Sequence, residues 1–293
     1  MTKSNRVIYI NSFQRSGSTL LGGLLGQLSE VSYLGEVRNL QDYYSNNSRC
    51  FCSKPIRQCE FWGQLLQQVD IEQLAHTKSL YGFGHRCLKL ASLSKWSLST
   101  IRSMSSIIPA FADEFQLIEN ISGIYRAAQS VEGRQVICDS SHRTTQCRLL
   151  YELYGEELKI ISLVRDGRAV VNSVRRRTGS SIGAAATRWE RFHRVQKLMY
   201  RVIPDRNRLF IRYEDLCDDP IGTLKKICEF AQIKYEQADN ALHFIGGSST
   251  IRSNKSSVST IHLDEKWRHQ LTDADLALFK KVAGPLNYTF GYH

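Results

Sequence analysis

Hydroxyl and cationic side chains gather directly after the first apolar segment of the chain. Residues 7–10 are β-branched or aromatic, which is typical of a buried strand, and leucines recur at helical spacing through a predicted helix at 17–29. Five residues lie at this turn: Arg15, Ser16, Gly17, Ser18 and Thr19. The first N–H groups of a helix lack intrahelical partners, and the helix dipole favours negative charge there. The pattern therefore predicts a phosphate-like anion site, with an ordinary strand-to-helix turn capped by Ser or Thr as the alternative.

The turn is not a Walker A loop, which needs an earlier Gly and a Lys before the Ser/Thr. Asn11 and Ser12 stand where the first Gly would be sought, and Ser18 replaces the Lys. A nucleotide kinase stays open as an alternative, because the apolar segment 135–138 ends in Asp139, which could hold Mg²⁺.

Glu36 follows a second predicted strand at 31–35. In a right-handed βαβ unit the end of this strand would lie beside the first loop, so Glu36 would face the anion site. A carboxylate in that position is a candidate general base. A surface Glu that merely ends a strand is the alternative.

Two segments of the chain resemble the sulfotransferase family. Residues 15–21 with Gly35 and Glu36 resemble the family's 5′-phosphosulfate loop and base, and residues 163–173 resemble its 3′-phosphate segment. The resemblance extends over nearly the whole chain and is greatest to the bacterial and cyanobacterial soluble type. It implies 3′-phosphoadenosine 5′-phosphosulfate (PAPS) as co-substrate and 3′-phosphoadenosine 5′-phosphate (PAP) as product. No metal is expected, because the cations and helix amides already supply a positive field.

The resemblance also implies roles for individual residues. Glu36 would be the base, Arg15 and residues 16–19 would bind the 5′ side, and Arg165 with Ser173 would hold the 3′-phosphate. Tyr213 would lie near the adenosine, and Arg252, in a Gly/Ser-rich loop, would reach the 3′-phosphate. A Lys that the family often carries near Ser140 is absent, so that either His142 or Arg143 replaces it or Arg15 acts alone.

Three cysteines, Cys50, Cys52 and Cys59, are close together in the sequence. A zinc site would need a fourth ligand, and none follows at finger-like spacing. Relatives carry a similar loop, usually with Gly where this chain has Ser53. We therefore predict a folded loop near the acceptor pocket and no metal.

The net charge of +11 is concentrated in one window. Residues 165–212 hold twelve arginines and one lysine against three carboxylates. The interpretations, in order of preference, are a solvated helix face, a basic rim for an anionic donor, and a nucleic-acid patch. No apolar run approaches the length of a membrane span, and no signal-peptide pattern is present, so a cytoplasmic protein is expected.

These patterns predict one α/β domain over residues 1–293, with a P-loop-like, mostly parallel sheet of about four or five strands and helices on both faces. A mainly helical insertion at about 37–131 would shape the acceptor pocket. The predicted strands are 7–10, 31–35, 135–138, 158–164 and 208–213, and the predicted helices include 61–69, 85–106, 111–131, 142–154, 168–177, 219–230 and 272–283.

The predicted activity is transfer of a sulfuryl group from PAPS to a hydroxyl group of a small-molecule acceptor. An amine is the less favoured acceptor group, and the acceptor is expected to be a natural product. No nucleic-acid or membrane partner is expected. A P-loop-like kinase and a non-catalytic nucleotide or nucleic-acid binder are the alternatives.

Overall fold

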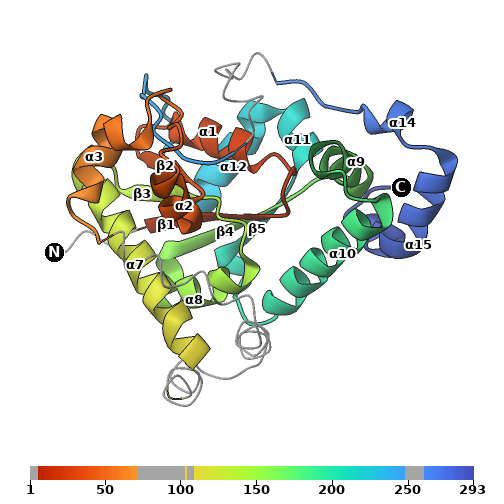
Figure 1. Cartoon of the computed structure of the whole chain (residues 1–293), viewed down its shortest axis with the longest axis horizontal. Coiled ribbons are helices and arrows are strands. Elements are labelled where there is room, and N and C mark those ends of the chain that lie inside the picture. The colour runs from red at the N-terminus through yellow and green to blue at the C-terminus, as the bar shows by residue number, and fades with distance from the viewer. Residues whose placement is uncertain (1–5, 71–102, 104–108, 248–260) are drawn as a thin grey trace.

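The fold is built on a five-stranded parallel sheet, seen in a computed structural model that describes residues 6–70, 103, 109–247 and 261–293. The strand order is β2-β3-β1-β4-β5, and every pairing is parallel (Figure 1). The strands are β1 (Arg6–Ser12), β2 (Val31–Gly35), β3 (Val136–Asp139), β4 (Leu158–Val164) and β5 (Arg208–Arg212). The predicted fold class is confirmed.

Helices connect and cover the strands. They are α1 (Ser18–Gly26), α2 (Leu40–Ser45), α3 (Glu60–Leu66), α7 (Pro109–Glu132), α8 (Thr144–Tyr154), α9 (Gly167–Thr178), α10 (Ile182–Met199), α11 (Tyr213–Asp218), α12 (Pro220–Ala231), α14 (Trp267–Gln270) and α15 (Asp273–Thr289). Most of the helix predicted at 85–106 lies outside the described residues. The last helix is longer than predicted, since it continues through Pro285 to Thr289.

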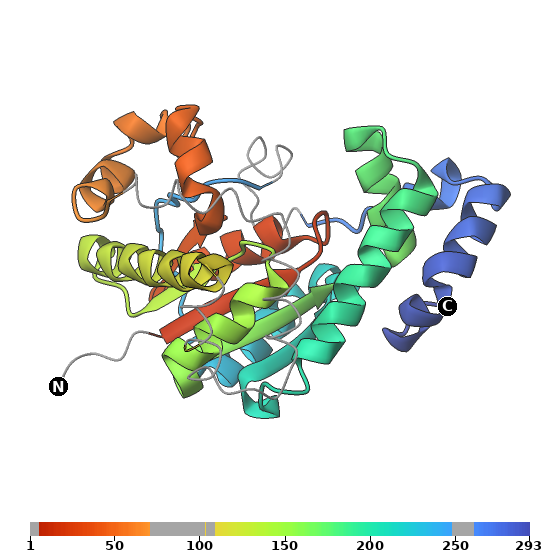
Figure 2. The same cartoon turned by 60° about the horizontal axis from the view of Figure 1, so that its bottom comes forward.

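The alternation of side chains along β1 produces two apolar layers. Val7 and Tyr9 pack into a core with α3, α7 and α8, whereas Ile8 and Ile10 pack into a second core with α1 and α12. Successive side chains of a strand point to opposite faces, so each face of the sheet is covered by helices (Figure 2).

A third core extends the fold beyond β5. Helices α9, α10 and α15 pack around Trp189, which is fully buried, and Phe13 of the loop after β1 joins this cluster. The loop is thereby fixed between the main sheet and the third core.

The sheet order differs from a simple βαβ unit at the first crossover. The strand β3 lies between β1 and β2. The chain therefore forms the edge strand β2 directly after β1 and only later adds β3 between them. Because all five strands are parallel, their carboxyl ends still meet at one edge of the sheet, which is where ligands bind in open α/β sheets.

Candidate functional site

A cleft of about 890 Å³ lies at the carboxyl edge of the sheet. Each strand end supplies at least one residue of its wall. The loop after β1 supplies Arg15, β2 is followed by Glu36, β3 by His142, β4 by Arg165 and β5 by Tyr213. The sheet thus brings together residues that are far apart in the sequence, including all but two of the predicted site residues.

The loop after β1 leads into the N-terminus of α1. Arg15 and Gly17 both have left-handed backbone conformations, with φ of 69° and 95°. A Cβ atom at Gly17 would lie 2.3 Å from a ring carbon of Tyr213, so only glycine fits both the backbone and the space. The turn places the N–H groups of the first turn of α1 at the cleft, as an anion site requires.

Glu36 lies in the cleft and is held on several sides. Its Oε2 accepts hydrogen bonds from Asn39 Nδ2 at 3.0 Å and from the Tyr43 hydroxyl at 3.2 Å. Its Oε1 accepts the N–H of Gly247 at 3.2 Å and lies 3.8 Å from His142 Nε2. A carboxylate fixed in this way keeps its orientation while one oxygen remains beside the cleft.

His142 occupies the place where the family's Lys was sought. Its Nδ1 lies 3.1 Å from the carbonyl oxygen of Ser12, which can only accept, so Nδ1 carries the proton of the neutral ring. Its Nε2 faces Ser18 Oγ at 3.3 Å and Glu36. Burial lowers the pKa of His142, and the negative charge of Glu36 offsets part of this effect. His142 and not Arg143 lines the cleft.

Arg165 lies at the end of β4 and is buried. Its guanidinium stacks over the ring of Tyr213 at 4.6 Å and donates to the carbonyl of Asp264 at 2.8 Å and to the carbonyl of Arg15 at 3.3 Å. Its Nε–H is buried and has no hydrogen-bond partner among the described residues. An orphaned donor of this kind at an anion cleft fits a phosphate ligand.

Arg15 and Ser173 are in direct contact. Arg15 Nε donates a hydrogen bond to Ser173 Oγ at 3.0 Å. Burial is the main cause that lowers the pKa of Arg15, and the positive charges of Arg177 and Arg165 lower it further. Several positive charges therefore act on one another at this end of the cleft, an arrangement that favours a multiply charged anion.

Some residues of the cleft were not predicted. Arg176 and Arg177, on the last turn of α9, line it together with Tyr43 and Gly247. A Cβ atom at Gly247 would lie 2.5 Å from Thr19 Cγ2, so this glycine permits the close approach of the segment after residue 244 to the first loop. Ser16, which was predicted to bind the 5′ side, is fully buried and does not line the cleft. Arg252 lies outside the described residues.

Asp139 does not face the cleft, contrary to what the kinase alternative requires. Its side chain is fully buried and accepts hydrogen bonds from the hydroxyls of Tyr125 and Ser141 and from the N–H of Ser141. Burial raises the pKa of Asp139 to about 6. A carboxylate committed to the core in this way is poorly placed to hold Mg²⁺ beside a phosphate.

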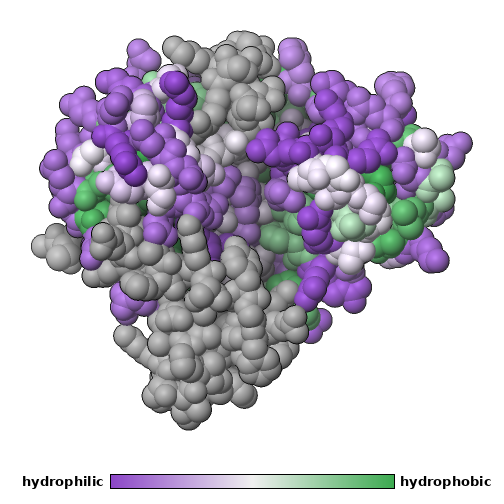
Figure 3. Space-filling view, in the orientation of Figure 1, coloured by the Kyte–Doolittle hydropathy of each residue, from purple (hydrophilic) through white to green (hydrophobic). Residues whose placement is uncertain are grey.

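The basic window divides between two of the predicted roles. Arg165, Arg176 and Arg177 line the cleft, whereas Arg188 and Arg194 on α10 are exposed and bond to Ser180 and Glu190. Figure 3 shows hydrophilic side chains gathered over α9 and α14 on the face that it presents. One part of the charge thus forms a rim of the cleft, and another part a solvated helix face.

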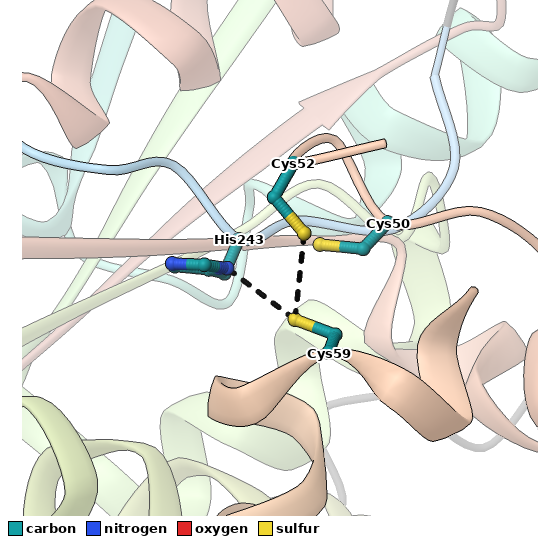
Figure 4. Close-up of side chains that lie close together, drawn as sticks. All are labelled: Cys50, Cys52, Cys59 and His243. Atoms are coloured by element: carbon teal, nitrogen blue, oxygen red, sulfur yellow. Dashed lines mark hydrogen bonds between the residues drawn. The ribbon is translucent and has the colours of Figure 1, made fainter. Parts of the chain in front are cut away.

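A separate cluster lies away from this cleft. Cys50, Cys52, Cys59 and His243 place one sulfur or nitrogen atom each within 4.8 Å of one another (Figure 4). The spacing of the sequence did not indicate His243 as a fourth ligand, because it lies 184 residues beyond Cys59.

Known proteins similar to this chain agree on one family. A family profile described as "Sulfotransferase family" matches residues 8–237. Carbohydrate sulfotransferase 5 of Mus musculus is 24% identical over 326 aligned positions, which cover 97% of this chain and 80% of that protein.

Two solved structures share the fold. The sulfotransferase domain from the curacin biosynthetic pathway has a TM-score of 0.53 at 17% identity, with 99% of this chain and 98% of that one covered. The sulfotransferase domain from the Synechococcus PCC 7002 olefin synthase has a TM-score of 0.50 at 20% identity, with 100% and 97% covered. Within the described ranges, we find no helix whose length and apolar character would let it cross a membrane.

Proposed function

The chain belongs to the sulfotransferase family, and from this we propose that it transfers a sulfuryl group from PAPS to a hydroxyl group of a small-molecule acceptor. One observation carries the proposal: Glu36 and the first loop, with Arg15 and the N-terminus of α1, line the same cleft. A base and an anion site beside one cleft are what transfer from an anionic donor to a hydroxyl requires.

Glu36 is proposed as the general base. It would take the proton of the acceptor hydroxyl as the oxygen attacks sulfur, and the bonds from Asn39 and Tyr43 support this role because they fix the carboxylate. His142 lies beside it with the unprotonated Nε2 toward Ser18. In this tautomer Nε2 can only accept, so we propose that His142 orients the Ser18 hydroxyl and that Arg15 acts alone where the family has its Lys.

The first loop is proposed to stabilise the leaving group. Negative charge grows on the oxygen that bridges phosphorus and sulfur as the bond breaks, and the N–H groups of residues 17–19 with Arg15 would offset it. Arg165 and Ser173 would hold the 3′-phosphate, and the buried Nε–H of Arg165 supports this assignment. Tyr213 would support both groups, since its ring packs on Gly17 and Arg165.

The acceptor is proposed to be a natural product that carries a hydroxyl, with an amine as the less favoured alternative. The name of the mouse relative indicates a carbohydrate acceptor for that protein, so sugar hydroxyls belong in the test. The segment 37–131, with α2, α3 and α7, is proposed to border the acceptor side of a single domain. A cytoplasmic location is part of the same proposal, because seven cysteines of the described residues are free thiols.

The test is an acceptor screen with ³⁵S-labelled PAPS. Purified protein is incubated with fractionated metabolite extracts, sugars and small phenols, and labelled products are counted and identified by mass. We expect at least one labelled product that depends on protein and is lost in the Glu36→Gln variant. The absence of labelled product in every fraction, together with no binding of PAP in calorimetry, would refute the proposal.

A further inference from the structure

Four ligand-type side chains converge on one point between two distant segments of the chain. Cys50 and Cys52 lie on the turn before α3, Cys59 lies directly before α3, and His243 lies near the end of the segment that returns from α12. Cys50 and Cys59 are buried, and Cys52 and His243 are half-buried. Figure 4 shows the sulfur of Cys59 facing both Cys52 and the ring of His243.

The two distances from Cys59 to its neighbours are close to those of a tetrahedral metal site. Zinc binds sulfur at about 2.3 Å and imidazole nitrogen at about 2.0–2.1 Å, so tetrahedral geometry separates two sulfurs by about 3.8 Å and a sulfur from a nitrogen by about 3.6 Å. Here Cys52 Sγ lies 3.6 Å from Cys59 Sγ, and Cys59 Sγ lies 3.3 Å from His243 Nδ1. All four ligand atoms lie within 4.8 Å of one another, so every other pair would contract by about 1 Å at most to reach these separations.

The imidazole of His243 is held in place beside the sulfurs. Its Nδ1 lies 3.3 Å from Cys59 Sγ. The ring of Phe61 stacks on His243 with 5.5 Å between centroids, which fixes the plane of the imidazole. A fixed ring with Nδ1 toward the sulfurs is oriented as a ligand must be.

The turn itself is built to hold Cys50 and Cys52 together. Ser53 has a left-handed φ of 74°, and its N–H donates to the carbonyl of Cys50 at 3.0 Å. The N–H of Cys50 in turn donates to the carbonyl of Lys54 at 2.9 Å. A non-glycine residue in this conformation is uncommon, and the tight turn brings the two thiols to the same side.

We propose that Cys50, Cys52, Cys59 and His243 form a structural zinc site. Three thiolates and one neutral imidazole fill a tetrahedral shell, and soft sulfur ligands select zinc over magnesium or calcium. Binding releases the thiol protons to water, and no oxidant or reductant takes part. With all four positions taken by the protein, the ion has a structural and not a catalytic role.

The zinc site would fasten the segment that touches Glu36. The N–H of Phe51 donates to the carbonyl of Phe244 at 3.0 Å, and the two rings stack at 4.5 Å. One residue further, the carbonyl of Ile245 accepts the N–H of Glu36 at 3.1 Å. The ion would therefore tie the turn at 50–59 to the strand-like segment that supports the proposed base, a consequence that rests on the proposed function.

The first test is metal content, which is independent of activity. Protein purified in a thiol reductant and dialysed without chelator is analysed for zinc by mass spectrometry and reconstituted with Zn²⁺ where needed. We expect about one zinc per chain, and Co²⁺ replacement should give the absorption of tetrahedral thiolate-bound cobalt. Zinc below a tenth of an equivalent after reconstitution, or a Cys52–Cys59 disulfide in the reduced preparation, would overturn the proposal.

The second test compares ligand variants with matched controls. Cys52→Ser and His243→Ala should each lower zinc affinity at least tenfold in competition with a colorimetric chelator. Cys228→Ala, a buried cysteine in another core, and His269→Ala, an exposed histidine, should retain zinc. If the ligand variants do not fold, the wild-type stoichiometry and cobalt spectrum decide. Full zinc retention by Cys52→Ser and His243→Ala would show that the metal lies elsewhere.

Discussion

Arg15 Nε donates a hydrogen bond to Ser173 Oγ, at 3.0 Å, across 158 residues of chain. The resemblance to sulfotransferases assigns these two residues to opposite ends of the donor, Arg15 to the 5′ side and Ser173 to the 3′-phosphate. In this structure they are partners, so Arg15 is drawn toward α9. This bond uses one of the five N–H donors of the guanidinium, so Arg15 need not leave Ser173 to reach the donor proposed for this cleft.

This contact leads to different expectations for the two side chains. Arg15→Ala should lower kcat more than it lowers the affinity for PAP, because charge on the bridging oxygen grows only as the bond breaks. Ser173→Ala should lower the affinity for PAP about tenfold while kcat changes less, since the substitution removes a ground-state contact to phosphate. Single-turnover rates and calorimetry measure the two effects. Equal losses of rate and affinity in Arg15→Ala would mean that Arg15 only anchors the donor.

Glu36→Gln should lower kcat roughly a hundredfold or more, as loss of a general base does. Gln retains the shape of the side chain, so the affinity for PAP should stay within a factor of about two, a difference of about 0.4 kcal/mol. The matched comparison is His142→Gln, which removes the imidazole whose Nε2 lies 3.8 Å from Glu36 Oε1. Turnover near that of the wild type in Glu36→Gln, with a large loss in His142→Gln, would transfer the role of base to His142.

Local patterns predicted the elements well. The strand at 158–164 has the predicted bounds, and the helix predicted at 168–177 spans Gly167–Thr178 and ends at Gly179, whose φ is 69°. Apolar runs bordered by turn residues determine such elements over short range. Tyr213 was predicted to end a strand but begins α11.

Contacts between distant segments could not be predicted in the same way. The insertion of β3 between β1 and β2, the bond from Arg15 to Ser173, and the approach of His243 to the cysteines all depend on sheet order. Sequence spacing does not indicate which strand is placed between two others in the sheet. Glu36 was placed at the cleft without this information because every parallel strand ends at the same edge.

Turnover should not require added magnesium. Asp139, the residue that a kinase would use, is buried against Tyr125 and Ser141. Omission of Mg²⁺ is the appropriate measurement, because a strong chelator would also compete for the proposed zinc. An absolute need for Mg²⁺, restored by returning the ion, would favour the kinase alternative.

Acid should destabilise the fold through His193. This side chain is fully buried, and burial lowers its pKa to about 4. The unfolded chain binds a proton near pH 6.5 and the folded chain does not, so the stabilising contribution is complete above that pH and is lost as the pH falls toward 4. The loss should reach about 3 kcal/mol in the free energy of unfolding.

Denaturant unfolding at several pH values measures this loss, and His193→Asn is the comparison. Nδ1 of His193 faces Gln196 Oε1 at 3.0 Å, and an Asn amide can donate to the same oxygen but does not titrate. The variant should show a smaller slope of stability with pH between 6.5 and 4. Equal slopes in both proteins would place the acid sensitivity in other groups.

Arg165 should determine the preference for a 3′-phosphate. Its guanidinium is buried, lies over Tyr213 and has an Nε–H without a partner among the described residues. A charge-assisted bond to phosphate contributes about 1.5–3 kcal/mol. The wild-type protein should therefore bind PAP much more tightly than adenosine 5′-phosphate.

Arg165→Ala should reduce this preference at least tenfold, about 1.4 kcal/mol, and should barely change the affinity for adenosine 5′-phosphate, which has no 3′ group. Arg168→Ala is the matched control, because Arg168 pairs with Asp166 and does not line the cleft. Calorimetric titration of both nucleotides against the three proteins provides the six affinities. If Arg165→Ala lowers the affinity for both nucleotides by the same factor, the Arg165 cation serves the 5′ side or the fold. A bond to the 3′-phosphate can affect only the affinity for the nucleotide that carries this phosphate.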